Sequence, residues 1–150
     1  MNFPILSSLI LLPSIGALFI LLSKSKDQSN YQSSKYVALF VSFANFFISV
    51  YLWYIFDPNI TDFQFVENRS WLPGFINYKV GIDGISILFI VLSTLITPLC
   101  IVSVNKSVNI KLKEFLIAIL LMESLMIGVF CSIDLVIFYL FFEGGLIPMF

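Results

Sequence analysis

The chain has 150 residues, of which 59% are hydrophobic and 11% are charged. Soluble domains carry about 25% charged residues, so this chain lacks the polar groups to cover a water-exposed surface. The formal net charge of -1 excludes nucleic-acid binding, which needs a basic surface to replace phosphate counterions. The composition therefore predicts a membrane protein.

The residue types that are missing narrow the chemistry. The chain has no histidine, which removes His-ligated haem, His-containing metal sites and Ser-His or Cys-His nucleophiles. Both cysteines, Cys100 and Cys131, lie inside apolar runs, where a free cysteine behaves as a small hydrophobic residue. A Walker-type loop and a GxGxxG motif are missing too. We therefore expect no metal site, no bound cofactor and no redox active site in this chain itself.

Charged residues are clustered along the chain and leave long apolar stretches between the clusters. A helix needs roughly 20 apolar residues to cross the hydrocarbon core of a bilayer. The first stretch is not typical of a signal peptide, because no Lys or Arg precedes it and no A-x-A cleavage site follows it. We expect one all-α polytopic membrane domain over residues 1–150, whose fifth helix is truncated by the end of the sequence. Its helices are predicted at residues 3–22, 36–56, 84–105, 115–133 and 135–150.

The basic residues predict the orientation of these helices. The loops after the first and third helices carry six lysines, whereas the other side of the membrane carries only Arg69 and Lys79. By the positive-inside rule, the Lys-rich loops face the cytoplasm or the mitochondrial matrix. The N-terminus then lies on the periplasmic or intermembrane side. The six lysines are Lys24, Lys26, Lys35, Lys106, Lys111 and Lys113.

The outer loop, residues 57–83, is predicted to form a short β-hairpin on the membrane surface. Residues 63–66 and 76–80 have strand character. Trp71 is expected near the lipid headgroups, where aromatic side chains gather. The residues expected to supply the turn between the strands are Asn68, Pro73 and Gly74.

Asp83 directly precedes the third predicted helix. Its carboxylate can accept hydrogen bonds from the first N–H groups of that helix, so the position predicts an N-cap. A role in proton entry is the alternative interpretation.

Two acidic residues lie where the membrane makes a charge costly. A charged side chain at the centre of a spanning helix costs about 2.5–3.5 kcal/mol, so such acids are rare and usually functional. Counted from Asp134 in the bend between the last two helices, Glu123 and Glu143 differ in depth by only about 3 Å. Both are predicted near the bilayer midplane as candidates for proton translocation. Whether they face each other depends on helix rotation, which the sequence leaves open.

The surroundings of Glu143 favour a functional role. Gly144 and Gly145 leave room for another helix to approach closely. Pro148 has no N–H for the Gly144 carbonyl, which is left free in an apolar setting, and Tyr139 adds a hydroxyl on roughly the same face. Such a group of polar atoms can hold water and exchange a proton. The alternative is a neutral acid that only links helices by hydrogen bonds.

Other polar features of the predicted helices are better explained by packing. Ser42, Asn45 and Ser49 form a stripe at helical spacing, for which helix packing is the favoured interpretation. Asn45 could also contact water in a transport path. Pro13 and Pro98 each free one backbone carbonyl inside a predicted helix.

Four segments carry a resemblance to a known family: 71–73 (Trp-Leu-Pro), 80–86 (Val-Gly-Ile-Asp-Gly-Ile-Ser), 138–143 (Phe-Tyr-Leu-Phe-Phe-Glu) and 146–149 (Leu-Ile-Pro-Met). They resemble the N-terminal part of subunit 4, or chain M, of the respiratory NADH:quinone oxidoreductase, complex I. The motif at 80–86 is shared with related antiporter-like subunits, whereas the motif at 146–149 favours subunit 4. The resemblance covers essentially the whole chain.

The resemblance implies a share in proton translocation driven by electron transfer from NADH to quinone. It matches Glu143 to the family's fifth-helix glutamate, which pairs with a lysine on a later helix, and Glu123 to a fourth-helix carboxylate. The chain would thus be part of an enzyme whose NADH, flavin, iron-sulfur clusters and quinone are bound elsewhere. Its implied partners are other membrane subunits of complex I and the lipid of a bacterial or mitochondrial inner membrane.

The family fold has more helices than this chain, so the sequence is expected to be a fragment or a remnant of a longer product. Two other functions stay open at this point. One is a subunit of a multisubunit cation/proton antiporter. The other is a structural or assembly subunit that does not pump.

Overall fold

The computed structural model describes residues 4–23, 28–72, 76–104 and 112–150, without the side chains of 28–31, 70–72 and 76. The described part contains five helices and one two-stranded sheet. In chain order they are α1 (Ile5–Leu22), α2 (Gln28–Ile55), β1 (Gln64–Leu72), β2 (Ile76–Ile82), α3 (Gly84–Ser103), α4 (Leu112–Cys131) and α5 (Leu135–Met149).

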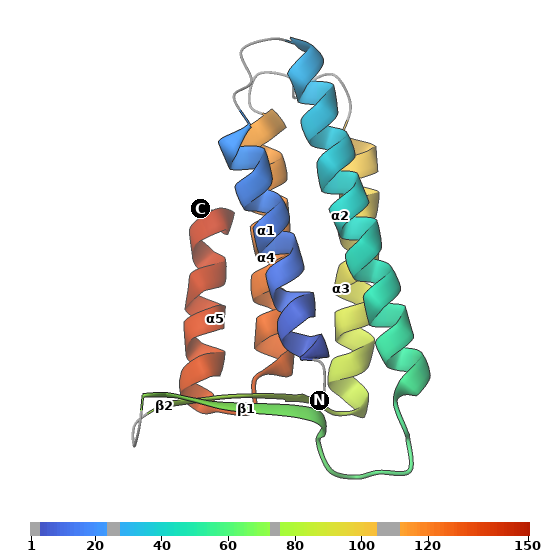
Figure 1. Ribbon diagram of the computed structural model, residues 1–150, viewed down its shortest axis with the longest axis vertical. Helices are drawn as coiled ribbons and strands as arrows, with labels where there is room; N and C mark the ends of the chain where they lie inside the picture. Colours follow the sequence, from blue (N-terminus) through green and yellow to red (C-terminus); the bar gives the residue numbers. More distant parts are fainter. Residues whose placement is uncertain (1–3, 24–27, 73–75, 105–111) are drawn as a thin grey trace.

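The helices form an upright antiparallel bundle, and the hairpin lies across one end of it (Figure 1). Helix α4 contacts each of the other four helices, and α5 packs on α4 at the side of the bundle. The hairpin covers the end where α1, α3 and α5 begin. The predicted fold class, an all-α polytopic membrane protein with a hairpin between its second and third helices, is confirmed.

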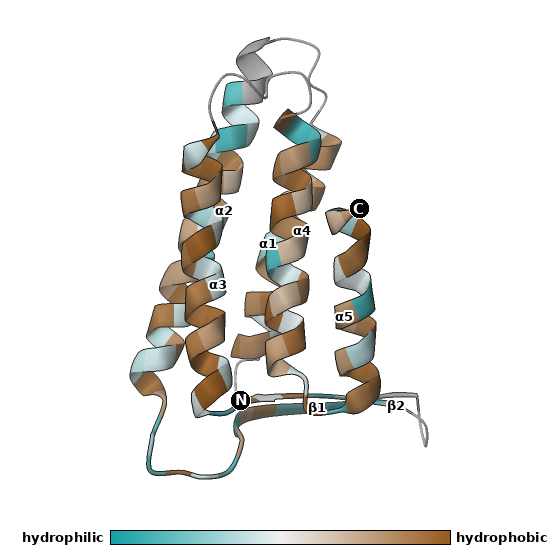
Figure 2. Cartoon of the chain, turned by 180° about the vertical axis from the view of Figure 1, so that it is seen from behind, coloured by the Kyte–Doolittle hydropathy of each residue, from teal (hydrophilic) through white to brown (hydrophobic). Residues whose placement is uncertain are grey.

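Hydropathy follows this arrangement. Four helices, α1 to α4, are long and apolar enough to cross a membrane, and α5 is a shorter apolar helix of 15 residues. Figure 2 shows the helices largely hydrophobic along their length, with more hydrophilic residues near the ends of the bundle. The bundle thus exposes a broad apolar surface of the kind that lipid covers.

Two helices begin earlier than the apolar stretches indicate. Helix α2 begins at Gln28 and α4 begins at Leu112, so each opens with polar or charged residues. Hydropathy marks only the part of a helix that lies in hydrocarbon, and Gln, Lys and Glu are good helix formers in water. The helical ends that extend past the apolar core were therefore missed.

The strands are longer than predicted. Asn68 was expected in the turn, but it lies within β1 and pairs with Lys79. A register shift between Gln64 and Glu67, where Phe65 has a φ of 54°, marks a bulge that the strand pattern concealed. Pro73, Gly74 and the side chain of Trp71 lie outside the described residues.

Alternation along the strands gives the hairpin two different faces. Glu67 and Tyr78 contact α1, and Val80 is fully buried. Burial raises the pKa of Tyr78 above its ordinary value of 10.0, so its hydroxyl keeps its proton. Lys79, between these positions, is exposed on the other face.

Acidic residues cap the helices at the hairpin end. The Asp83 carboxylate accepts from the Ser86 N–H at 2.7 Å, which confirms the predicted N-cap of α3. Hydrogen bonds from the Ser86 hydroxyl and amide hold the pKa of Asp83 below its ordinary value of 3.8. The Asp134 carboxylate likewise accepts from the Val136 N–H at 2.8 Å at the start of α5.

The first helix is capped by a residue from the hairpin. Pro4 precedes α1 and provides no side-chain hydrogen bond. The Glu67 carboxylate accepts instead from the N–H groups of Leu6 at 2.8 Å and Ser7 at 3.3 Å, and also from the Ser7 hydroxyl. It thereby satisfies two of the N–H groups that every helix leaves unpaired at its start. This contact fixes the hairpin to the bundle.

At the opposite end of the bundle, lysines donate hydrogen bonds to carbonyls where helices end. The Lys35 Nζ donates to the Val104 carbonyl at 2.8 Å, just after α3. The Lys113 Nζ donates to the carbonyls of Ser23 at 2.6 Å and Leu21 at 3.1 Å, where α1 ends. Positive charge is favourable at the C-terminus of a helix. The other four lysines of the Lys-rich loops lie outside the described residues.

We predict that Glu67→Ala loosens the start of α1. The substitution removes a cap and a negative charge at a helix N-terminus, which together stabilise by about 1–2 kcal/mol. Hydrogen exchange at the amides of Leu6 and Ser7 should become faster. Asp62→Ala, an exposed acid of the same outer loop, is the control and should leave these amides unchanged. Unchanged exchange in both variants would show that Glu67 is not the cap.

Candidate functional site

Glu123 is buried in the centre of the bundle. It lies on the buried stripe of α4, between Leu120 and Ile127, at a spacing of three to four residues. A hydrophobic residue would be expected there, but the carboxyl group is present and only 3% of the residue is exposed. The helical pattern thus directs an acid into the interior.

Asn45 of α2 is the partner of this acid. Its side-chain amide donates from Nδ2 to the Glu123 Oε1 at 2.8 Å, and the residue is completely buried. The sequence singled out both residues separately. It could not pair them, because residues 78 positions apart meet only through the packing of α2 on α4.

The pair has unused hydrogen-bonding capacity. Within the described part of the chain, neither the Asn45 Oδ1 nor the Glu123 Oε2 has a hydrogen-bond partner. Leaving buried polar atoms without partners costs about 1–3 kcal/mol each. A proton on the Glu123 carboxyl, or a water molecule that donates to both oxygens, can supply the donor. The site therefore has the chemistry to hold and release a proton.

The remaining members of the polar stripe on α2 have packing roles. The Ser49 hydroxyl is 2.7 Å from the Thr94 hydroxyl of α3, and Ser42 donates to the Leu39 carbonyl at 3.0 Å. Both serines are fully buried. The packing interpretation is confirmed for Ser49, whereas Asn45 reaches the acid.

A second polar contact lies beside Glu123. The Ser124 hydroxyl donates to the Ile10 carbonyl at 2.5 Å and is 2.7 Å from the Ser14 hydroxyl, which joins α4 to α1. Sequence reasoning missed these serines. The signal that the sequence offers is their position: Ser124 directly follows Glu123, and Ser14 directly follows Pro13.

Glu143 lies on a different face. It is exposed, as is Tyr139 one turn earlier on the same helix. Helix α5 has a single fully buried residue, Ile137, so most of its surface is turned away from the other helices. Glu123 and Glu143 are therefore on neighbouring helices but are not brought together.

Helices α4 and α5 approach each other more closely at Gly128 than at Gly144 and Gly145, where the sequence predicted room for a close approach. A Cβ atom at Gly128 would lie 2.6 Å from the Phe141 ring, so a larger residue at this position in α4 would require that ring to move. At Gly144 the nearest atom, from Leu125, is at an ordinary 3.4 Å, and at Gly145 nothing lies within 4 Å. Pro148 lies near the end of α5 and is half-buried.

Metal-binding clusters of three or more suitable side chains do not occur among the described residues. Cys131 is buried and Cys100 is exposed, and both are free thiols.

The bundle, its hairpin and its buried acid define a polytopic α-helical membrane protein with a carboxyl group in its interior. The chain is 45% identical to NADH-ubiquinone oxidoreductase chain 4 of Marchantia polymorpha and 46% identical to NADH-quinone oxidoreductase subunit M of Rhodobacter capsulatus, over 97% of its length in each case. It is 41% identical to subunit M of Rickettsia prowazekii over 100% of its length. The resemblance predicted from the sequence motifs is confirmed.

The chain spans only part of these relatives, namely 29%, 28% and 31% of their respective lengths. No protein-family model matches it.

We predict opposite effects for two substitutions in the buried pair. Asn45→Ala leaves the Glu123 Oε1 without its donor and should lower the free energy of unfolding by about 1–3 kcal/mol. Glu123→Gln keeps an acceptor for Asn45 and replaces the unpaired oxygen by a donor, so it should be at least as stable as the wild type. Denaturant titration in micelles measures both. Equal destabilisation by the two variants would contradict the assigned hydrogen bond.

Proposed function

We propose that the chain is part of a membrane subunit of a proton-translocating NADH:quinone oxidoreductase. The observation that carries this function is the Glu123–Asn45 pair, a buried acid with unused acceptors inside a bundle of apolar helices. The names of the similar proteins support the same function. In this proposal the redox chemistry takes place in other subunits of the complex.

In this proposal Glu123 is a proton-binding group and Asn45 is its positioning residue. The amide fixes one carboxyl oxygen through a hydrogen bond of 2.8 Å, so proton exchange takes place at the other oxygen. Acids inside a membrane are commonly members of proton relays. The hydrogen bond keeps the carboxyl in one orientation while its proton comes and goes.

Glu143 has a different position in the proposed relay. Because it lies on the exposed face of α5 with Tyr139, its partner must come from outside the five described helices. Another membrane subunit, or a further segment of a longer product, can supply a cation there. The backbone carbonyl left free by Pro148 is close along the helix and can bind water.

The orientation is part of the proposal. The lysines at the ends of α1 and α3 support an orientation with that end of the bundle on the cytoplasmic or matrix side and the hairpin on the periplasmic or intermembrane side. Asp83 lies at the hairpin end as a helix cap. A part for Asp83 in proton entry stays a prediction.

The test is substitution of each acid in the assembled complex. Glu143→Gln and Glu123→Gln should each strongly reduce proton translocation and coupled quinone reduction, because an amide cannot carry the proton. Glu114→Gln, the same change at an exposed position of α4, is the matched control and should pump normally. Proton uptake by vesicles and NADH oxidation are measured together.

Normal pumping by correctly assembled Glu143→Gln and Glu123→Gln variants would contradict the proposal and leave a structural role. Exchange that depends on sodium or potassium but not on NADH would instead identify a cation/proton antiporter.

A further inference from the structure

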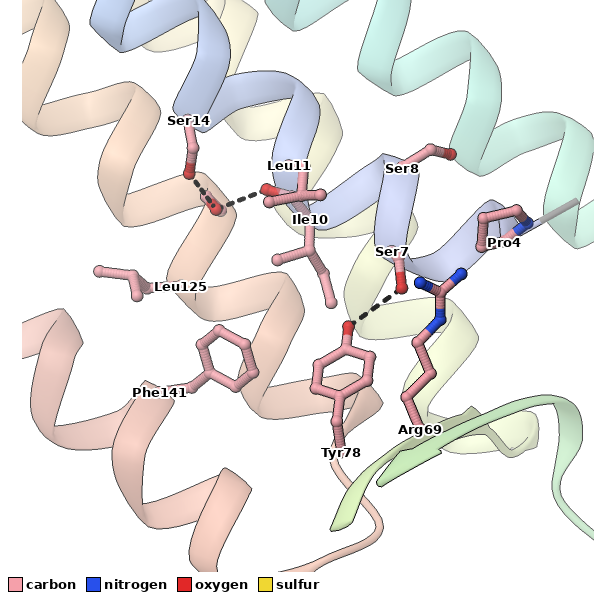
Figure 3. A pocket seen from close by; sticks show the side chains of 11 residues that line it. Pro4, Ser7, Ser8, Ile10, Leu11, Ser14, Arg69, Tyr78, Leu125 and Phe141 are labelled. Carbon is pink, nitrogen blue, oxygen red and sulfur yellow. Dashed lines mark hydrogen bonds between the residues drawn. The ribbon is translucent and has the colours of Figure 1, made fainter. Parts of the chain in front are cut away.

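A cavity of about 540 Å³ lies between α1, α4, α5 and the hairpin (Figure 3). It is separate from the Glu123–Asn45 pair, which lies between α4 and α2. Its chemistry changes from the hairpin end toward the middle of the bundle.

The hairpin end of the cavity is polar and positively charged. Arg69 pairs directly with Tyr78 across the strands, so both side chains are on the face turned to the bundle. Figure 3 shows the Arg69 guanidinium beside the first turn of α1, near Ser7 and Pro4. Arg69 is exposed, and a guanidinium offers five N–H donors in a planar fork that suits phosphate.

The neighbouring acid, Glu67, directs its hydrogen bonds to α1 and not to Arg69. The Glu67 carboxylate is already occupied by the backbone and hydroxyl of Ser7 and by the Leu6 N–H at the start of α1. Its charge is thus directed at the helix N-terminus. The hydroxyls of Ser7 and Ser8 also line the entrance to the cavity, where they donate to the Glu67 carboxylate and the Ile5 carbonyl.

The rest of the cavity is apolar. Ile10 and Leu11 line it from α1, Leu125 from α4 and Phe141 from α5. The hydroxyls at its inner end, Ser14 and Ser124, bond to each other and to a backbone carbonyl, so they do not require water. An occupant of this part needs no polar groups.

The cavity has the length to hold part of a hydrocarbon chain. From Ser7 to Ser14 the cavity follows α1 for about 10 Å. A flexible chain of methylene groups fits this space.

We propose that the cavity binds one anionic phospholipid, with its phosphate on Arg69 and one acyl chain between α1, α4 and α5. The hairpin places Arg69 where α1 and α5 begin and α4 ends, which is the depth of lipid headgroups. An inward-facing arginine at that depth, above an apolar groove, matches both parts of such a lipid. The site is independent of proton translocation.

The test uses the subunit in its native complex and a phosphatidylglycerol with a photoreactive diazirine in its acyl chain. Cross-links should map to peptides that contain Leu11, Leu125 and Phe141. Unlabelled phosphatidylglycerol should compete about tenfold better than phosphatidylcholine, because both lipids carry a phosphate but the choline cation of phosphatidylcholine is repelled by Arg69, and a tenfold difference corresponds to about 1.4 kcal/mol.

Arg69→Gln should reduce the labelling about tenfold. Lys79→Gln, which removes the neighbouring cation on the opposite face of the hairpin, is the matched control and should label like the wild type. Equal competition by phosphatidylcholine would overturn the charge recognition. Labelling that is absent from these peptides, or unchanged in Arg69→Gln, would overturn the site and indicate that protein covers the cavity.

Discussion

The hydrogen bond from Asn45 to Glu123 is the interaction on which the interior of this bundle depends, because it holds the one fully interior acid of the described helices. Helix α4 contacts all the others, so a polar group at its centre must be satisfied by one of them. Asn45 satisfies only one of the two carboxyl oxygens. The same contact therefore joins α2 to α4 and leaves an atom at which a proton can bind.

The polar backbone groups at the ends of the helices also need hydrogen-bond partners. In an apolar surrounding, unpaired N–H and C=O groups are costly, and this chain pairs them with charged side chains from distant segments. Glu67 serves the start of α1, and Lys113 serves its end. The hairpin is further held by a hydrogen bond from the Ile133 N–H to the Lys79 carbonyl at 3.1 Å. Loops and helices are thereby locked together at both ends of the bundle.

The sequence predicted the five helices, the hairpin, the cap at Asp83 and two acids within the spanning helices, because hydropathy and local capping chemistry are readable residue by residue. It did not predict the partner of Glu123, the cap provided by Glu67 or the polar start of α2. The first two depend on contacts between residues far apart in the chain. The rotation of each helix about its own axis could not be predicted either. It turns Glu143 outward and brings Gly128 against the Phe141 ring.

The most direct measurement of the central claim is infrared difference spectroscopy of the working complex, with the carbonyl stretch of a protonated carboxyl group as the signal. A band that changes during turnover, disappears in Glu123→Gln and shifts in Asn45→Ala is the expected result. A spectrum without such a band, or a band that is the same in all three proteins, would contradict proton exchange at Glu123.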